Sequence, residues 1–280
     1  MNELKTILVH VDAAPNMAQR LKLAQWLAQR HGARIEVLYA VLPAVLQFPY
    51  AFAGDAQAAS MLMGFETDQR ERARAAFERE RKASPALSEA VWYEATDEPV
   101  RAVTQHAWGV DLLLLAQHDP DPKVYSGLPP DFTATVLIDS GKPGLVMPYV
   151  GASPTVGQNV LIAWKPTAES ARAVTAALPL LQRAQKVHVA AWDESSAPDA
   201  PPPGVAIEPY LRRHGIAAEV HRGGRPGHDV GELLLSLAAD LQADLLVMGC
   251  YGRGRAREWL LGGVTRSVLQ SMTLPVLMAH

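Results

Sequence analysis

A glycine-rich stretch near the end of the chain has the residue types that bind phosphate. It reads VMGCYGRGRAREWLLGGVT, from Val247 to Thr265, between an apolar run and a helical pattern. Glycine lets backbone N–H groups approach a ligand closely, and the first N–H groups of a helix favour an anion. The spacing is neither that of a P-loop nor that of the GxGxxG dinucleotide motif. From these residues alone, a phosphate site and a plain strand-to-helix turn are both open interpretations.

Other side chains of this stretch also have two interpretations. Arg253, Arg255 and Arg257 either clamp phosphates or lie exposed on the loop. Cys250 is a candidate redox sensor, although its reactivity depends on a thiol pKa that the sequence does not give. The histidines show no metal-ligand spacing, and no nucleophile–base pair stands out. We therefore assign no metal ligand and no catalytic residue.

The composition is that of an ordinary globular protein. The chain has 280 residues, of which 49% are hydrophobic and 20% charged, with a net charge of -3. This balance argues against a protein that coats nucleic acid. The single cysteine excludes an intrachain disulfide and fits a reducing compartment. No apolar run approaches the roughly 18 residues of a membrane span, and the start lacks a signal-peptide layout. We expect a cytoplasmic protein that binds neither nucleic acid nor membrane.

The elements that position the glycine stretch occur twice in the chain. Thr6–Asp12 resembles Asn159–Lys165, and Val110–Leu115 resembles Ala243–Met248. Continuous apolar strands that alternate with helical patterns are typical of a parallel sheet covered on both faces. The sequence therefore predicts an α/β fold with two tandem doubly wound parallel-sheet domains. In such sheets ligands bind at the edge where the strands end.

The two halves are separated by a small, flexible stretch at residues 151–157. We place the domains at 1–150 and 151–280. The first half carries an insert after its second strand, at about residues 42–82. This insert joins an apolar segment, Phe48–Phe65, to a charged helix whose charges we expect to face solvent.

The glycine stretch in its strand–loop–helix setting resembles the universal stress protein family, whose motif is G-x2-G-x9-G-(S/T/N). Gly249, Gly252 and Gly262 match the three glycines. The resemblance covers the whole chain, from ILVHVD at the start to TLPVLMAH at the end, and is that of a tandem member. It implies an adenine nucleotide alpha hydrolase-like fold, with both domains paired as an intramolecular pseudo-dimer. Many members bind ATP, with Mg²⁺ accompanying it, and a few hydrolyse it slowly.

The resemblance also implies which residues hold the nucleotide. The residue before the first glycine and the first two glycines line it: Met248, Gly249 and Gly252. The third glycine and the two residues after it hold phosphates: Gly262, Gly263 and Val264. An Asp at the end of the first strand completes the pocket in the family.

This sequence departs from the family pattern in both halves. Gly263 replaces the hydroxyl residue, which removes one hydrogen bond of order 1 kcal/mol and so weakens a site without abolishing it. Lys165 replaces the Asp in the second half, where its ammonium either pairs with a phosphate or is solvated. The first half keeps Asp12 but lacks the glycines, and Pro130 has no N–H to offer. We expect the first half not to bind nucleotide in the family's way.

Two tryptophans stand at the edge of the expected pocket of the second half. Trp164 and Trp192 end its first and second strands. They either stack on a base or fill the space that adenine would take. Both interpretations stay open, and the nucleotide-binding set includes Lys165 and Trp192.

Three functions are consistent with these residues. The first is a stress-response regulatory protein that binds ATP or another adenine nucleotide in its second half and changes stability through that binding. The second is a nucleotide-free interaction protein with filled pockets, which uses the apolar insert. The third is an enzyme, at most a slow ATPase. The glycines favour the first, whereas Gly263 and Lys165 favour the second. A homodimer is a further expectation, and the sequence identifies no protein partner.

Overall fold

The computed structural model describes residues 3–95, 97–121, 124, 126–150, 155–192, 206–223, 229–251 and 263–280. The chain forms two compact units: the N-terminal unit, Leu4–Lys142, and the C-terminal unit, which contains Pro143–His280. The predicted domains, 1–150 and 151–280, stay a prediction, because compactness groups residues 143–150 with the C-terminal strands.

The N-terminal unit is built on four parallel strands in the order β3-β2-β1-β4. They are β1 (Thr6–Val11), β2 (Arg34–Ala40), β3 (Val91–Ala95) and β4 (Leu112–Ala116). The first and last coincide closely with the predicted apolar runs. Apart from Thr6 and Ala116, every residue of β1 and β4 is buried, as expected for central strands covered on both faces.

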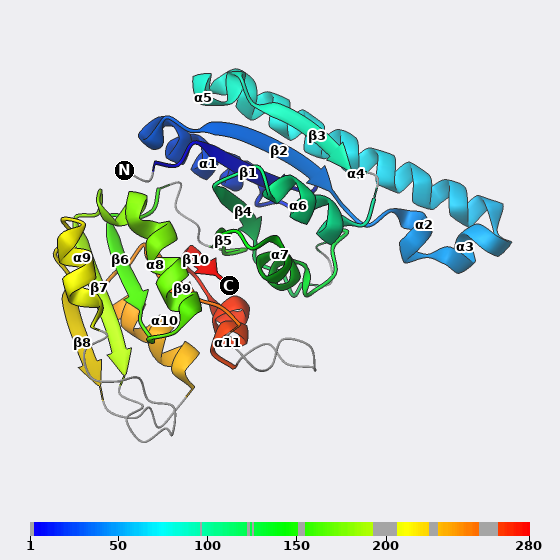
Figure 1. Ribbon diagram of the computed structural model, residues 1–280. Helices are drawn as coiled ribbons and strands as arrows, with labels where there is room; N and C mark the ends of the chain where they lie inside the picture. The colour runs from blue at the N-terminus through cyan, green and yellow to red at the C-terminus, as the bar shows by residue number, and fades with distance from the viewer. Residues whose placement is uncertain are drawn as a thin grey trace. The chain divides into compact units, whose positions relative to one another are not determined.

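Helices cover both faces of this sheet (Figure 1). One face carries α1 (Met17–His31), with α4 (Ala56–Ala83) and α5 (Pro85–Ser88) packed on it, and the other carries α6 (Pro99–Ala107) and α7 (Phe132–Ser140). The short helices α2 (Ala44–Gln47) and α3 (Pro49–Gly54) precede α4. Within the described residues, no helix has both the length and the apolar character that crossing a membrane requires.

The predicted insert is helical for most of its length. The charged segment was expected to form a helix, and α4 begins ten residues before it, because the Asp55 carboxylate accepts hydrogen bonds from the N–H groups of Gln57 and Ala58. Only Ala73 and Phe77 are buried along α4, so its charged side chains face solvent as predicted. Phe77 packs against Trp92 of β3, with ring centroids 5.1 Å apart.

The C-terminal unit is built on six strands in the order β5-β10-β9-β6-β7-β8. They are β5 (Gly144–Met147), β6 (Asn159–Ala163), β7 (Lys186–Trp192), β8 (Glu219–Gly223), β9 (Leu245–Gly249) and β10 (Val276–Ala279). All neighbours are parallel except β5 and β10, which run antiparallel. The predicted α/β class, with a parallel sheet in each half, is confirmed. The pairing of the two domains within one chain stays a prediction.

The helices of this unit are α8 (Ala168–Leu181), α9 (Ile207–Arg213), α10 (Val230–Asp240) and α11 (Gly263–Ser271). Of these, α8 packs on the face to which Leu245 of β9 points, and α10 packs against α11. Arg222 of β8 forms an ion pair with Glu208, which places α9 on the same face as Arg222. Because side chains alternate along a strand, the neighbours of Arg222 on β8 point to the opposite face.

The repeated aspartate of the two halves has the same structural task in each unit. Asp111 accepts hydrogen bonds from the N–H groups of Lys5 and Thr6, at 2.8 and 2.9 Å. Asp244 accepts from Gly157, Gln158 and Asn159, at 2.9 to 3.0 Å. Each carboxylate thus satisfies backbone donors that precede or begin a strand, β1 for Asp111 and β6 for Asp244. The internal repeat therefore reflects a folding requirement as well as a common pattern of elements.

Candidate functional site

In the C-terminal unit, the end of β9 lies directly against the start of α8. A Cβ atom on Gly249 would lie 2.5 Å from the backbone nitrogen of Ser170 and 2.7 Å from the carbonyl carbon of Glu169. No side chain fits there, because backbone atoms cannot move aside. The first glycine of the predicted motif is therefore required by packing, independently of any ligand.

Glu169 is a charged group near the glycine turn that the sequence analysis did not identify. Its side chain is buried beside Gly249, where burial alone would raise its pKa. The net pKa is nevertheless lowered, because its own N–H, the Thr167 hydroxyl and Arg172 stabilise the carboxylate. These partners are those of a helix N-terminus, so Glu169 helps to fix the start of α8. Nothing in the sequence beyond its place in the first turn marks it.

The two residues after Gly249 turn sharply and are buried. Tyr251 has a φ of 55°, in the left-handed region that side chains rarely adopt, and both it and Cys250 are buried. Burial, followed by the Glu169 charge, raises the pKa of the Cys250 thiol to about 12. The thiol is therefore protonated at neutral pH, which argues against the redox-sensor hypothesis.

The third part of the motif lies at the amino end of α11. This helix begins at Gly263, which is exposed, and no described atom lies within 4 Å of the place where a Cβ would stand. The first N–H groups of α11 have no partner within the helix and suit an anion. Val264 is half-buried and Thr265 is buried. Gly252 and Gly262, together with Arg253, Arg255 and Arg257, lie outside the described residues.

Three more predicted residues follow neighbouring strands. β6 lies between β9 and β7 in the sheet. Trp164 and Lys165 directly follow β6, while Gly249 ends β9 and Trp192 ends β7, so these residues stand at the ends of neighbouring parallel strands. Lys165 is exposed, and both tryptophans are half-buried, which leaves stacking and filling open. Met248 is buried within the sheet, so it can only offer its backbone to a ligand.

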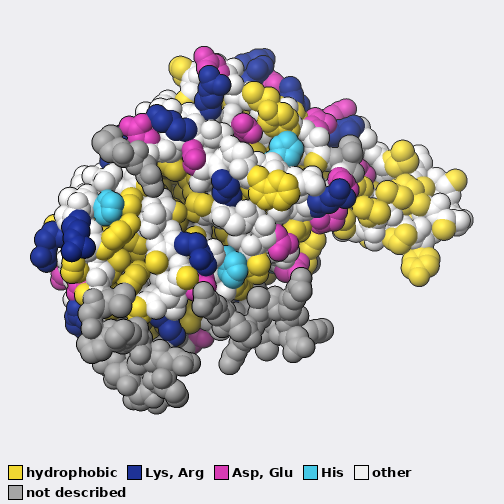
Figure 2. Space-filling view, viewed as in Figure 1, with side chains coloured by type: hydrophobic (Ala, Val, Ile, Leu, Met, Phe, Trp, Pro, Cys, Tyr) yellow, Lys and Arg dark blue, Asp and Glu magenta, His cyan; other side chains and the backbone are white. Residues whose placement is uncertain are grey.

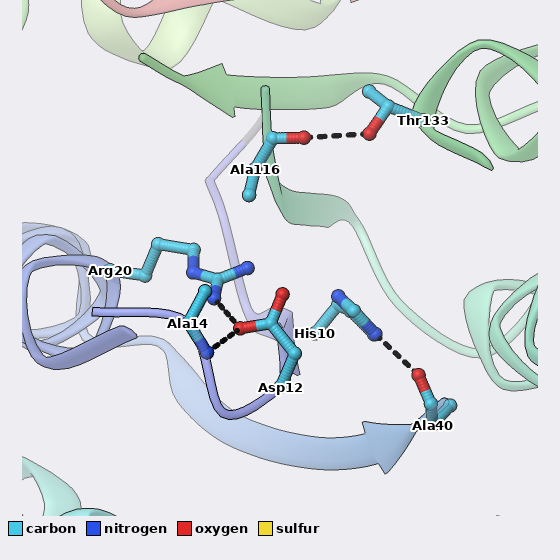
Figure 3. Close-up of polar contacts among 7 residues, drawn as sticks. All are labelled: His10, Asp12, Ala14, Arg20, Ala40, Ala116 and Thr133. Atoms are coloured by element: carbon cyan, nitrogen blue, oxygen red, sulfur yellow. Dashed lines mark hydrogen bonds and ion pairs between the residues drawn. The ribbon is translucent and has the colours of Figure 1, made fainter. Parts of the chain in front are cut away.

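In the N-terminal unit, Asp12 already has a protein partner (Figure 3). Its Oδ1 atom forms an ion pair with Nη2 of Arg20 from α1 and accepts a 3.1 Å hydrogen bond from the N–H of Ala14. The side chain of Asp12 is 2% exposed and that of Arg20 is 0% exposed. This carboxylate is therefore shielded from solvent and engaged by groups of the protein itself.

Further contacts tie the adjacent strand ends to protein groups. Nε2 of His10 lies 2.8 Å from the carbonyl oxygen of Ala40. The hydroxyl of Thr133 in α7 donates a 2.7 Å hydrogen bond to the carbonyl of Ala116 (Figure 3). Burial lowers the pKa of His10 to about 4, with Asp12 opposing and Arg20 adding to the shift. The imidazole is thus neutral at neutral pH. That the first half does not bind nucleotide in the family's way stays a prediction.

A cavity of about 200 Å³ lies beside these strand ends in the N-terminal unit. Its walls come from the end of β2 and from the insert, chiefly Tyr39, Val41, Phe48, Leu62 and Phe65. Glu66 also borders it, but its carboxylate accepts a 3.0 Å hydrogen bond from the N–H of Ala44. The cavity is smaller than the roughly 300 Å³ at which ligand pockets usually begin. It offers room for a small apolar group.

Solved structures share this fold along the whole chain. A universal stress protein from Archaeoglobus fulgidus DSM 4304 aligns with a TM-score of 0.69 at 16% identity, over 98% of this chain and 95% of that chain. A functionally unknown protein from Pseudomonas aeruginosa PAO1 aligns with a TM-score of 0.59 at 17% identity, over 99% and 92%. At these identities the similarity shows the fold.

Sequence comparison identifies the family. No curated protein matches this sequence significantly. The profile of the Universal stress protein family, however, matches residues 3–124 and again residues 157–280. These two segments contain most strands of both sheets and include the glycine stretch. The chain therefore belongs to the universal stress protein family and carries two copies of the family's domain in tandem.

Proposed function

We propose that this protein is a stress-response regulator that binds an adenine nucleotide in its C-terminal unit, and that this nucleotide is ATP. The observation that carries this proposal is the amino end of α11, at the family's motif spacing after β9, where no described atom lies within 4 Å of a Cβ on Gly263. In the N-terminal unit, the aspartate at the end of the first strand, Asp12, is buried against Arg20. One chain would thus hold one nucleotide.

The described residues suggest a role for each part of the site. The N–H groups of Gly263 and Val264 would hold phosphate oxygens, supported by the helix dipole. Lys165, exposed after β6, would add a positive charge. Trp164 and Trp192, both half-buried, would stack on the base. Mg²⁺, bound with ATP, would neutralise phosphate charge. We assign no catalytic residue, so the proposed role is binding.

Binding would act on the protein through linkage. A ligand that binds only the folded state stabilises it in proportion to the logarithm of its concentration over its Kd. One phosphate chain would contact both the start of α11 and the turn after β9. The state of the C-terminal unit would then follow the cellular nucleotide level, which is what a regulator requires.

The first experiment asks whether nucleotide is present and whether it binds. Freshly purified protein is heat-denatured and the supernatant is separated by nucleotide chromatography. Tryptophan fluorescence is then followed while ATP, ADP or cAMP is added with MgCl₂. The proposal expects released adenine nucleotide or a saturable response that Gly252→Val removes. Gly254→Val, which alters a glycine of the same stretch at a position that the motif leaves unspecified, is the matched control. No released nucleotide and no response at millimolar ATP would contradict the proposal.

A second function, protein binding by the insert, is favoured by exposed apolar side chains. Figure 2 shows hydrophobic side chains gathered over α2, α3 and the adjoining end of α4. The large exposed ones are Val45, Leu46, Phe48, Tyr50, Met61, Met63 and Phe65, with Tyr50 91% exposed. Contiguous apolar surface of this kind marks interaction sites in soluble proteins.

The simplest partner to test is a second copy of the chain. Light scattering over a range of protein concentrations should show association that Leu46→Ser/Tyr50→Ser removes. Trp108→Ser changes an exposed apolar residue outside the insert and is the control. A monomer at every concentration would contradict self-association through the insert.

A further inference from the structure

Three side chains that ligate metals gather on one face of β7 and β8. In the parallel register, His188 of β7 lies opposite Glu219 of β8, and Ala190 lies opposite His221. Residues two apart on a strand point to the same face, so Glu219 and His221 share a face with His188. That face is opposite the one to which Arg222 points.

The ligand atoms of the three side chains are close together. Nδ1 of His188 is 3.0 Å from Nε2 of His221 and 3.6 Å from Oε2 of Glu219. The three ligand atoms all lie within 4.8 Å of one another. A tetrahedral ion with bonds of about 2.0–2.2 Å needs its ligand atoms roughly 3.3 Å apart. The observed distances lie on both sides of that value, so small side-chain shifts bring the ligands into place.

The surroundings favour a bound cation. The His188 side chain is 8% exposed and forms a buried floor, whereas Glu219 is 70% exposed and leaves the cluster open to solvent. Burial lowers the pKa of His188. The charges of His221 and Lys186 lower it further, whereas the charge of Glu219 opposes the shift. Glu219 supplies a negative charge that offsets that of the ion.

We propose that His188, Glu219 and His221 form a binding site for a divalent transition-metal ion such as Zn²⁺. Two imidazole nitrogens and one carboxylate are ligands of zinc and similar ions, whereas Mg²⁺ and Ca²⁺ prefer oxygen ligands alone. Three protein ligands leave one tetrahedral position to water. The ion would join β8, the outermost strand of the sheet, to β7.

This site is separate from the nucleotide site. His188 and His221 are each the third residue of their strands, whereas the glycine stretch follows the carboxyl end of β9. The two ligand histidines are 33 residues apart in sequence, which is why no motif with metal-ligand spacing contains them. The proposal is independent of nucleotide binding.

The test uses the full chain without a histidine tag. Protein freed of metal with EDTA and then dialysed is titrated with ZnCl₂ by calorimetry and with CoCl₂ by visible absorption. We expect one equivalent to bind saturably and to raise the Tm. Loss of groups that merely orient ligands weakens metal affinity about 10–100-fold, so His221→Ala should weaken it at least tenfold. Glu219→Gln, at an exposed position, should weaken it as well without affecting folding.

His214→Ala is the matched control, because His214 belongs to the same unit and its ring packs on Tyr210 instead. This variant should bind metal as the unmodified protein does. Circular dichroism shows whether each variant is folded. Equal affinity in His221→Ala, Glu219→Gln and unmodified protein would overturn the proposal, as would the absence of saturable binding. The 3.0 Å contact would then be a hydrogen bond between two imidazoles.

Discussion

Asp12 and Arg20 form an ion pair in which both side chains are buried. The resemblance to the family implies a place beside the nucleotide for this aspartate, and here its carboxylate is engaged by Arg20. The Nε and Nη1 atoms of Arg20 have no hydrogen-bond partner among the described residues. The guanidinium is therefore buried without a full set of hydrogen bonds among the described residues. Removing either partner would leave a buried charge without its counter-charge, which greatly lowers the free energy of unfolding.

Arg20→Met should lower the free energy of unfolding of the N-terminal unit by about 3–5 kcal/mol, because it leaves the Asp12 charge buried and unpaired. The double variant Asp12→Leu/Arg20→Met should be much less destabilised, since it removes both charges and two unsatisfied donors. Urea unfolding measured by circular dichroism, with hydrogen exchange to locate the change, checks both. Equal losses in the single and double variants would contradict a coupled pair.

His10 should make the stability of the protein depend on pH between about 6.5 and about 4. Burial lowers its pKa from 6.5 to about 4 in the folded state, so in this range the unfolded chain binds a proton that the folded chain does not. The contribution is present above pH 6.5 and is lost as the pH falls, by at most about 1.4 kcal/mol per unit. It totals of order 3 kcal/mol.

His10→Gln keeps a donor for the carbonyl of Ala40 and does not titrate, so it should lose this dependence. Urea unfolding measured at intervals from pH 7.5 to pH 4.5 would give the free energy of unfolding of both proteins. Its slope against pH should differ between them by ~1 kcal/mol per pH unit. Parallel pH curves for variant and unmodified protein would show that His10 is not the group responsible.

The central strands could be predicted from the sequence because a strand buried on both faces consists of consecutive apolar residues, as in Leu112–Ala116. The side-chain partners of Asp12 and His188 could not be predicted. Arg20 is an ordinary helix residue in the sequence, and only packing of α1 on β1 makes it the partner of Asp12. β8 has a largely polar sequence, Glu219–Gly223, which carries no apolar run, so the register that joins His188 to His221 was not foreseeable.

Cys250 should be unreactive in the folded protein. It is buried, and its pKa is raised to about 12, so almost no thiolate forms at neutral pH. Titration with Ellman's reagent should show no fast reaction in buffer and one thiol in guanidinium chloride, since the chain has one cysteine. Rapid modification of the native protein would show that the turn after β9 opens.

Gly249→Ala should destabilise the C-terminal unit whether or not nucleotide binds. Its new Cβ would lie 2.5 Å from the Ser170 nitrogen, and overpacking of this kind costs about 1–3 kcal/mol or more when the backbone must move. Gly263→Ala, which adds a methyl group where no described atom lies within 4 Å, is the matched control and should not clash. Thermal unfolding of both variants without nucleotide separates the packing role of the first glycine from any role in binding.

Gly263→Ser should strengthen ATP binding. It restores the hydroxyl of the family pattern at the start of α11, in space that the described structure leaves open. A hydrogen bond to a charged phosphate contributes about 1.5 kcal/mol or more, which corresponds to roughly tenfold in Kd. Fluorescence titration with ATP and MgCl₂ measures the change, and Gly263→Ala separates the hydroxyl from the effect of losing a glycine. If serine and alanine give the same Kd, the added hydroxyl does not reach the phosphates and this prediction is wrong.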